Sequence, residues 1–181
     1  MSNLIICISG DGGGSYGPSG VYHMLAESLD ALNSKHWKVL PYETIPKNIY
    51  TNKDNICSYI EHNKSYYNRI YLIGWSLGTA TAIEVTHELK NTIYAIIMLA
   101  PILHQCRMKN FLNINLPIGY IHGKHDVVAK YTNSQKLYDH TPNYRIIQIN
   151  ENADHLFSGC ELWLNETIIN MLYELDRSEK L

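Results

Sequence analysis

The sequence lacks any run of basic residues and has few charged side chains of either sign. Charged residues make up 18% of the 181 residues, and the formal net charge is −2 with the histidines neutral. Binding to nucleic acid or to an anionic membrane surface needs a cluster of positive charge. We therefore expect neither of these as a partner.

Cysteine is scarce as well, and the four cysteines lie far apart in the sequence. They form no CxxC pair and no Cys/His cluster, so no zinc site is predicted. We expect neither a metal nor another cofactor. The first of them lies within an apolar run, which is typical of a buried, reduced thiol. The four are Cys7, Cys57, Cys106 and Cys160.

No hydrophobic stretch is long enough to cross a membrane. The first apolar run, Leu4–Ile8, stops before Gly10 and follows no basic residues, so it resembles neither a signal peptide nor a membrane span. A spanning helix needs about 20 apolar residues, and no window reaches that length. A cytoplasmic, reducing environment is the default expectation.

Linkers, repeats and low-complexity tracts are absent too. Hydrophobic residues make up 45% of the chain, a globular mixture, and 181 residues is close to the size of one ordinary domain. A domain of this length buries roughly 70% of the surface that its unfolded chain exposes. We expect a single domain over residues 1–181, and the sequence does not indicate an oligomeric state.

Short apolar runs alternate with longer helical patterns along the chain. Several runs are apolar on both faces, which is typical of parallel strands covered on both sides. Six strands alternating with five helices predict a three-layer, doubly wound α/β fold with a parallel sheet. The expected strands are Leu4–Ser9, Trp37–Tyr42, Arg69–Gly74, Tyr94–Ala100, Pro117–Gly123 and Tyr144–Asn150. The expected helices are Gly20–Leu32, Lys53–Asn63, Leu77–Lys90, Lys130–His140 and Cys160–Leu175.

One connection departs from this rhythm. Ile102–Asn115, between the fourth and fifth strands, carries only a weak helical signal. It holds roughly a dozen residues, which is too few for a lid domain.

A G-x-S-x-G motif, Gly74–Gly78, follows the third expected strand and precedes a helix. In parallel sheets, functional groups gather at the carboxyl ends of the strands. A nucleophile in a tight strand-to-helix turn has strained backbone dihedrals, and side chains two residues away would crowd it. The turn would expose the Ser76 hydroxyl at a helix N-terminus, where negative charge is favoured.

An aspartate and a histidine follow two later strands. Asp126 comes after the fifth strand and His155 after the sixth. Ser, Asp and His thus arrive in that chain order, each at the same edge of the sheet, which is the arrangement of a Ser-Asp-His triad. The sequence predicts Ser76 as nucleophile, Asp126 as acid and His155 as base.

Other acidic and imidazole groups compete poorly for these roles. Asp154 adjoins the expected base, and adjacent side chains do not readily meet in triad geometry. His122 and His125 lie before the usual position of the base, and His87 falls inside a helix. Glu151 is the fallback acid.

The first expected strand leads into a glycine-rich loop, Ser9–Pro18. An oxyanion hole needs two N–H donors near the nucleophile. The backbone N–H of Leu77 would supply one and that of Asp11 the other, with the Asp11 carboxylate turned away. Neighbouring glycines would let the main chain approach the reacting carbonyl.

The same loop supports a second interpretation. Gly12, Gly14 and Gly17 fit G-x-G-x-x-G after a first strand, and Glu43 ends the second strand near the place of a ribose-binding acid. Against it, Pro18 would break the helix that should already be under way. No Lys-Ser/Thr pair follows the glycines, which excludes a P-loop.

These motifs resemble those of the α/β-hydrolase superfamily, in particular its compact, lidless members such as the retinoblastoma-binding serine hydrolases. The specific part of the likeness is Gly74–Gly78, Gly123–Asp126 and Asp154–Phe157, although it extends from Leu4 to the last helix. The resemblance implies a serine hydrolase with the same three triad residues. Ser9 departs from the pattern, because many lipases and esterases carry His at that position.

The sequence thus predicts hydrolysis of a small-molecule acyl ester or thioester through an acyl-enzyme. Without a lid, the pocket should be shallow and open, which favours small or extended acyl groups. Two alternatives remain: a nucleotide-binding doubly wound protein that uses the Gly10–Gly17 loop, and a non-catalytic interaction protein with a hydrolase fold. By loop position, the candidate pocket walls are Gly12, Tyr16, Trp75, His104 and Phe157.

Overall fold

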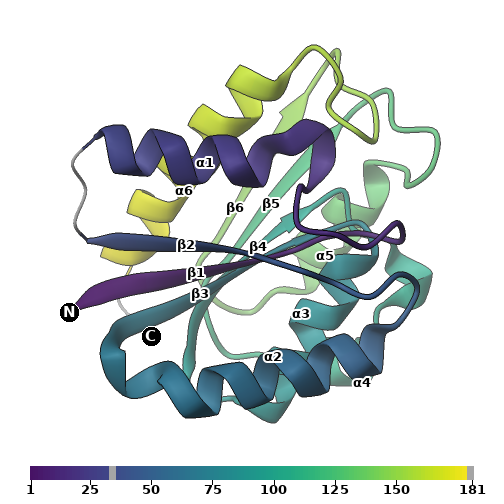
Figure 1. Cartoon of the computed structure of the whole chain (residues 1–181). Coiled ribbons are helices and arrows are strands. Elements are labelled where there is room, and N and C mark those ends of the chain that lie inside the picture. The colour runs from purple at the N-terminus through teal and green to yellow at the C-terminus, as the bar shows by residue number, and fades with distance from the viewer. Residues whose placement is uncertain (33–35, 179–181) are drawn as a thin grey trace.

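The computed structural model describes residues 1–32 and 36–178, in which strands and helices alternate (Figure 1). The strands are β1 (Ser2–Ile8), β2 (Trp37–Tyr42), β3 (Tyr67–Trp75), β4 (Ile93–Leu99), β5 (Ile118–Gly123) and β6 (Arg145–Asn150). The helices are α1 (Val21–Ala31), α2 (Ile49–Asn63), α3 (Leu77–Glu88), α4 (Met108–Phe111), α5 (Thr132–His140) and α6 (Glu161–Arg177). Three 3₁₀ turns are η1 (Pro18–Gly20), η2 (Lys64–Tyr66) and η3 (Leu103–Gln105).

All six strands form one parallel sheet in the order β2-β1-β3-β4-β5-β6. The predicted doubly wound α/β fold is therefore confirmed. The strand order reverses at β1, because the chain moves from β1 outward to β2 and then returns to the other side of β1 as β3. Open α/β sheets bind ligands at the carboxyl ends of the strands beside such a reversal.

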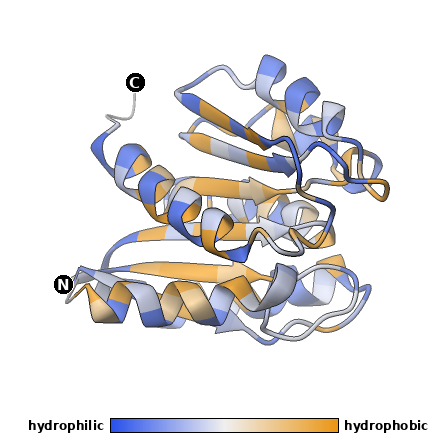
Figure 2. Cartoon of the chain, turned by 90° about the horizontal axis from the view of Figure 1, so that it is seen from above, coloured by the Kyte–Doolittle hydropathy of each residue, from blue (hydrophilic) through white to orange (hydrophobic). Residues whose placement is uncertain are grey.

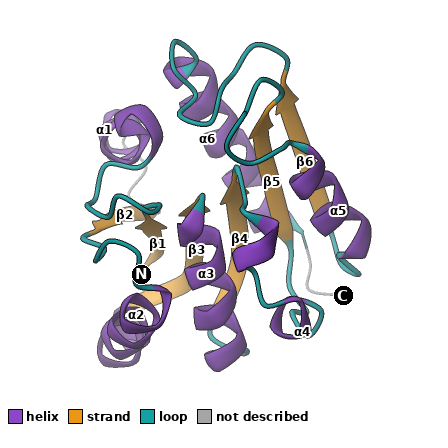
Figure 3. Cartoon of the chain, turned by 90° about the vertical axis from the view of Figure 1, so that its right-hand side faces the viewer, coloured by secondary structure: helices purple, strands orange, loops and turns teal. Residues whose placement is uncertain are grey.

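Helices cover both faces of the sheet. α1 and α6 lie on one face, and α2, α3 and α5 lie on the other (Figures 1 and 3). Successive side chains of β1 alternate between the two layers: Leu4 and Ile6 pack in the α2/α3 layer, and Ile5 and Cys7 pack in the α1/α6 layer. Both faces of the sheet are therefore buried under helices. Figure 2 shows the central strands as mainly hydrophobic, whereas hydrophobic and hydrophilic residues alternate along the helices.

Two details depart from the expected elements. α2 begins at Ile49, earlier than the expected Lys53, because the Asn48 side chain accepts a 3.1 Å hydrogen bond from the Thr51 N–H and caps the helix. The weakly helical segment between β4 and β5 forms η3 and the short helix α4.

The β4–β5 connection is fastened to α3. The Asn110 amide of α4 donates to both carboxylate oxygens of the buried Glu84, each at 3.0 Å. No additional domain is inserted between strands in the part of the chain that the structure describes. None of the helices in that part combines the length and the apolar character needed to cross a membrane.

Candidate active site

Ser76 lies alone between the end of β3 and the start of α3. Its φ of 54° and ψ of −120° are unusual for a residue with a side chain. The surrounding backbone holds this conformation: the Ser76 N–H donates to the Leu99 carbonyl at 2.8 Å, and the Thr79 N–H donates to the Ser76 carbonyl at 3.1 Å. A strained residue fixed by its neighbours is typical of a functional position.

The two glycines of the G-x-S-x-G motif are required by close packing. A Cβ atom on Gly74 would lie 2.6 Å from the Gly78 carbonyl oxygen, and a Cβ on Gly78 would lie 2.2 Å from the Ile8 carbonyl oxygen. Both distances are far below van der Waals contact, and the atoms met are backbone atoms that have little room to move. The glycines therefore let α3 approach β1 and β3 closely enough to form the turn around Ser76.

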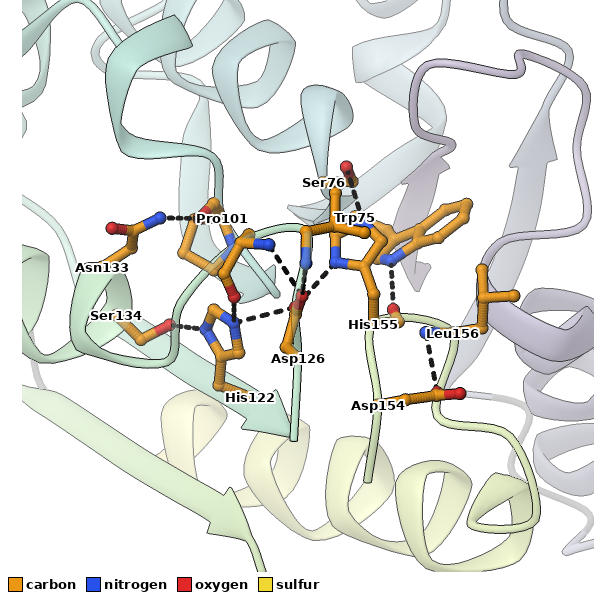
Figure 4. Close-up of polar contacts among 12 residues, drawn as sticks. Trp75, Ser76, Pro101, His122, Asp126, Asn133, Ser134, Asp154, His155 and Leu156 are labelled. Carbon is orange, nitrogen blue, oxygen red and sulfur yellow. Dashed lines mark hydrogen bonds and ion pairs between the residues drawn. The ribbon is translucent and has the colours of Figure 1, made fainter. Parts of the chain in front are cut away.

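His155 lies on the loop between β6 and α6, with its Nε2 atom 3.0 Å from Ser76 Oγ (Figure 4). The Asp154 carboxylate shapes this loop by accepting from the N–H groups of Leu156 at 3.0 Å and Ser158 at 2.9 Å. These hydrogen bonds, the Ser158 amide first, hold the pKa of Asp154 below its usual value. Across the loop, the Ser19 hydroxyl donates to the Leu156 carbonyl at 2.7 Å.

Asp126 lies on the other side of the His155 ring. Its Oδ2 atom is 2.6 Å from His155 Nδ1, and its Oδ1 atom accepts from the N–H groups of Val128 at 2.8 Å and Ala129 at 2.7 Å. The carboxylate is fully buried. Burial alone would raise the pKa of Asp126, but hydrogen bonds from His122, His155 and the Ala129 amide outweigh it and lower the pKa well below its usual range. Asp126 is therefore an ionised acceptor at neutral pH.

A second imidazole contacts the same carboxylate. His122 Nε2 lies 3.1 Å from Asp126 Oδ2, and the His122 side chain has no exposed surface. Sequence reasoning set His122 aside because it precedes the usual position of the base, and it missed this contact. The available signal was a polar ring within an apolar strand, because buried polar groups in folded proteins have hydrogen-bond partners.

The other competing residues lie away from the Ser76–His155–Asp126 network. Glu151, the fallback acid, pairs with Lys124 on the surface. His125 is exposed, and His87 is half-buried near the C-terminal end of α3. Within the part of the chain that the structure describes, no group of three or more His, Cys, Asp or Glu side chains is arranged to hold a metal ion.

The glycine-rich loop after β1 lies beside Ser76. A turn is closed by the Gly13 N–H, which donates to the Gly10 carbonyl at 3.1 Å. Gly14 and Thr44 exchange two backbone hydrogen bonds of 3.0 Å, which fix the loop to the segment after β2. Ser9 occupies the position where many lipases and esterases carry histidine. Its hydroxyl accepts a 3.1 Å hydrogen bond from the Gly17 N–H, which joins the two ends of the loop.

The end of this loop differs from a dinucleotide-binding turn. Pro18 opens the 3₁₀ turn η1, and α1 begins only at Val21, after Gly20 in a left-handed conformation with φ 78°. The glycines therefore do not run directly into a helix N-terminus, which is the feature that binds a pyrophosphate.

A cavity of about 350 Å³ opens at Ser76. Gly12 and Trp75, two of the expected walls, line it. Tyr16 and His104 are exposed and do not belong to its lining. Phe157 has no exposed surface, packs in the hydrophobic core of the α1/α6 layer and does not belong to the cavity lining. The lining residues are Asp11, Gly12, Trp75, Ser76, Leu77, Ile102, Gln105, Val128 and His155.

Solved structures share this architecture at low sequence identity. Est1E from Butyrivibrio proteoclasticus, in a structure with ferulic acid bound, superposes with a TM-score of 0.81 at 16% identity over 97% of this chain and 90% of its own. For dienelactone hydrolase from Anabaena variabilis, the TM-score is 0.74 at 14% identity over 93% of this chain and 86% of the other. The chain has the α/β-hydrolase fold.

A third solved structure with this architecture is a lipase-esterase related protein from Clostridium acetobutylicum, with a TM-score of 0.72 at 16% identity over 93% of each chain. No family model matches the sequence, and no curated protein matches it in sequence. The narrower resemblance to the retinoblastoma-binding serine hydrolases stays a prediction.

Proposed function

We propose that this protein is a serine hydrolase that cleaves a carboxylic ester or thioester through an acyl-enzyme on Ser76. The observation that carries the proposal is the position of one imidazole: His155 lies 3.0 Å from Ser76 Oγ through Nε2 and 2.6 Å from Asp126 Oδ2 through Nδ1. The base is thus within hydrogen-bond reach of both the nucleophile and the orienting acid, as nucleophilic catalysis by serine requires.

Each group has one task in the reaction. His155 Nε2 takes the hydroxyl proton as Ser76 Oγ bonds to the acyl carbon, and then gives this proton to the alcohol or thiol that leaves. A water molecule, deprotonated by His155, next attacks the acyl-enzyme, and the proton returns to Ser76 with release of the acid. Because Asp126 accepts from Nδ1, it keeps Nε2 free to receive the proton and stabilises the imidazolium.

The backbone N–H groups of Leu77 and Asp11 would bind the oxyanion. Both residues line the cavity together with Ser76, and Leu77 is the first residue of α3, where helix N–H groups lack intrahelical acceptors. The Gly10–Gly13 turn supports the role of Asp11: in a trans peptide the N–H points opposite to the carbonyl, so the Asp11 N–H faces out of the turn.

The cavity favours an acyl group that is uncharged and largely apolar. Its lining includes the apolar side chains of Trp75, Leu77, Ile102 and Val128, together with the Gln105 amide. Its volume of about 350 Å³ lies at the lower end of the range of small-molecule sites. A short aliphatic chain or a single aromatic ring would fit, in line with the ferulic acid bound to the structural neighbour Est1E.

Labelling by a fluorophosphonate and hydrolysis of p-nitrophenyl esters of graded chain length test this proposal. We expect the wild-type protein to be labelled and to prefer short acyl chains, and Ser76→Ala to lose both reactions. Ser15→Ala is the matched control, because the Ser15 hydroxyl also faces a histidine, His23, at 3.4 Å but has no network with an acid. Labelling retained in Ser76→Ala, or absent in the wild type, would reject the proposal. Dinucleotide binding without serine reactivity would select the nucleotide-binding alternative.

A further inference from the structure

His122 makes three polar contacts although its side chain is fully buried. It lies on β5, and its Nε2 atom is 2.7 Å from the Ala129 carbonyl oxygen and 3.1 Å from Asp126 Oδ2. Its Nδ1 atom is 2.8 Å from Ser134 Oγ on α5. The ring therefore connects α5 to the residue that orients His155 (Figure 4).

These contacts determine which nitrogen carries hydrogen. A backbone carbonyl can only accept, so the 2.7 Å contact with Ala129 requires a hydrogen on His122 Nε2. That same N–H is shared with Asp126 Oδ2. In the neutral ring, Nδ1 is then an acceptor and takes the hydroxyl hydrogen of Ser134. Ser134 thus favours the tautomer that presents an N–H to Asp126.

Both oxygens of the Asp126 carboxylate consequently accept hydrogen bonds. Oδ2 lies between two imidazoles, His122 and His155, and Oδ1 accepts two backbone amides. No lysine or arginine is among its hydrogen-bond partners in the described part of the chain. A carboxylate with donors on both oxygens cannot rotate about its χ2 without losing hydrogen bonds, so its Oδ2 atom stays directed at His155 Nδ1.

We infer that His122, oriented by Ser134, is a positioning residue that acts through Asp126 on His155. The inference rests on the proposed function of Ser76, Asp126 and His155. His122 does not touch the cavity, so it contributes no direct contact with substrate. A purely structural role, in which His122 only joins β5 to α5, is the competing explanation, and the experiment below separates the two.

Two substitutions at His122 differ in whether they keep an N–H donor for Asp126. His122→Gln retains an N–H donor near the place of Nε2, whereas His122→Leu fills similar space without a donor. With p-nitrophenyl butyrate, we expect His122→Leu to lose kcat by about 10- to 100-fold at an unchanged KM, because a small misplacement of Asp126 and His155 is enough for a loss of this size. His122→Gln should recover most of that loss. Ser134→Ala should lower kcat by about two- to tenfold.

Tyr120→Phe is the matched control. Tyr120 lies two residues earlier on the same strand, is fully buried, and its hydroxyl has a 2.6 Å hydrogen bond to Thr141 Oγ1. The substitution removes a buried hydrogen bond between β5 and the end of α5 without touching Asp126. We expect a lower unfolding midpoint with kcat within twofold of wild type. Proton NMR supplies a second readout: the downfield signal of the hydrogen between His155 Nδ1 and Asp126 should shift in His122→Leu and not in Tyr120→Phe.

Wild-type kcat and an unshifted NMR signal in folded His122→Leu would overturn the inference, while an inactive Ser76→Ala would leave the proposed function intact. If His122→Leu does not fold, Ser134→Ala provides the test. An unchanged kcat and an unshifted NMR signal in Ser134→Ala would then overturn the inference. If the wild type proves inert toward fluorophosphonate, the proposed function fails, and the NMR comparison alone still tests whether His122 holds the Asp126–His155 pair.

Discussion

The Trp75 indole N–H donates a 3.1 Å hydrogen bond to the His155 carbonyl oxygen, and the two rings lie 5.6 Å apart between centroids. The residue directly before Ser76 thus holds the loop that carries the histidine. Trp75 also lines the cavity. One side chain therefore links the place where an acyl group would bind to the group that would move the proton.

Trp75→Phe should lower kcat by about three- to tenfold, because it keeps an aromatic wall but removes one hydrogen bond worth about 1 kcal/mol. Steady-state kinetics with p-nitrophenyl butyrate measures this. Trp163→Phe on α6 is the control, since Trp163 packs partly buried in the α1/α6 layer away from the cavity. Equal loss in both variants would show that the hydrogen bond to His155 has no specific effect.

Asp126→Asn should lower kcat by about 10³- to 10⁴-fold with little change in KM. An asparagine can donate to His155 Nδ1, which leaves the hydrogen on Nε2 and removes the acceptor for the Ser76 proton. Asp154→Asn is the control, because this neighbouring carboxylate accepts from loop N–H groups and from the Ser158 side chain, and an amide oxygen can replace it as an acceptor. It should stay within tenfold of wild type. More than a tenth of wild-type activity in Asp126→Asn would contradict the assigned role.

Acid should remove the contribution of Asp126 to stability. The folded-state pKa of this carboxyl is lowered, so its contribution is present above the unfolded Asp pKa of about 3.9 and is lost as pH falls toward the folded value. Urea unfolding at several pH values measures this. The free energy of unfolding of wild type should exceed that of Asp126→Asn by a smaller amount at about pH 3 than at about pH 5. A difference that widens on acidification would oppose this explanation.

Gly78→Ala should destabilise the protein by about 3 kcal/mol or more. Alanine is the better helix former by about 1 kcal/mol, but its Cβ would lie 2.2 Å from the Ile8 carbonyl oxygen, and such overpacking against backbone outweighs the helical gain. Gly12→Ala is the control, because a Cβ there meets nothing within 4 Å, and it should stay within about 0.5 kcal/mol of wild type. Urea unfolding compares the two, and equal stabilities would contradict the packing argument.

The sheet and the turn at Ser76 could be predicted because their signals are local. Short runs that are apolar on both faces predict the buried strands. The five consecutive residues Gly74–Gly78 predict the tight turn. The Asn48 cap of α2 is a local signal as well, and it marks a helix start at Ile49 instead of the predicted Lys53.

The surroundings of the site could not be read in the same way, because they depend on contacts distant in sequence. The His122 ring contacts Ser134 on α5 and the Ala129 carbonyl oxygen, which lie twelve and seven residues further along the chain, and these contacts determine which of its nitrogens faces Asp126. Phe157 is a second case: an aromatic residue in a loop suggests a pocket wall, but its side chain is fully buried in the hydrophobic core. A polar ring within an apolar strand indicates that His122 has hydrogen-bond partners, but residue type and spacing do not say which ones.

The place of His155 after β6, the last of the described strands, has a consequence for synthesis of the chain. β6 pairs only with β5, and His155 follows it, so the last member of the network is also the last to leave the ribosome. A nascent chain can form β1, β3 and the turn at Ser76 while the histidine is still inside the exit tunnel. Under the proposed function, the serine therefore stays without its base until translation has passed residue 155, and fluorophosphonate reactivity would report when the Ser76–His155–Asp126 network has formed.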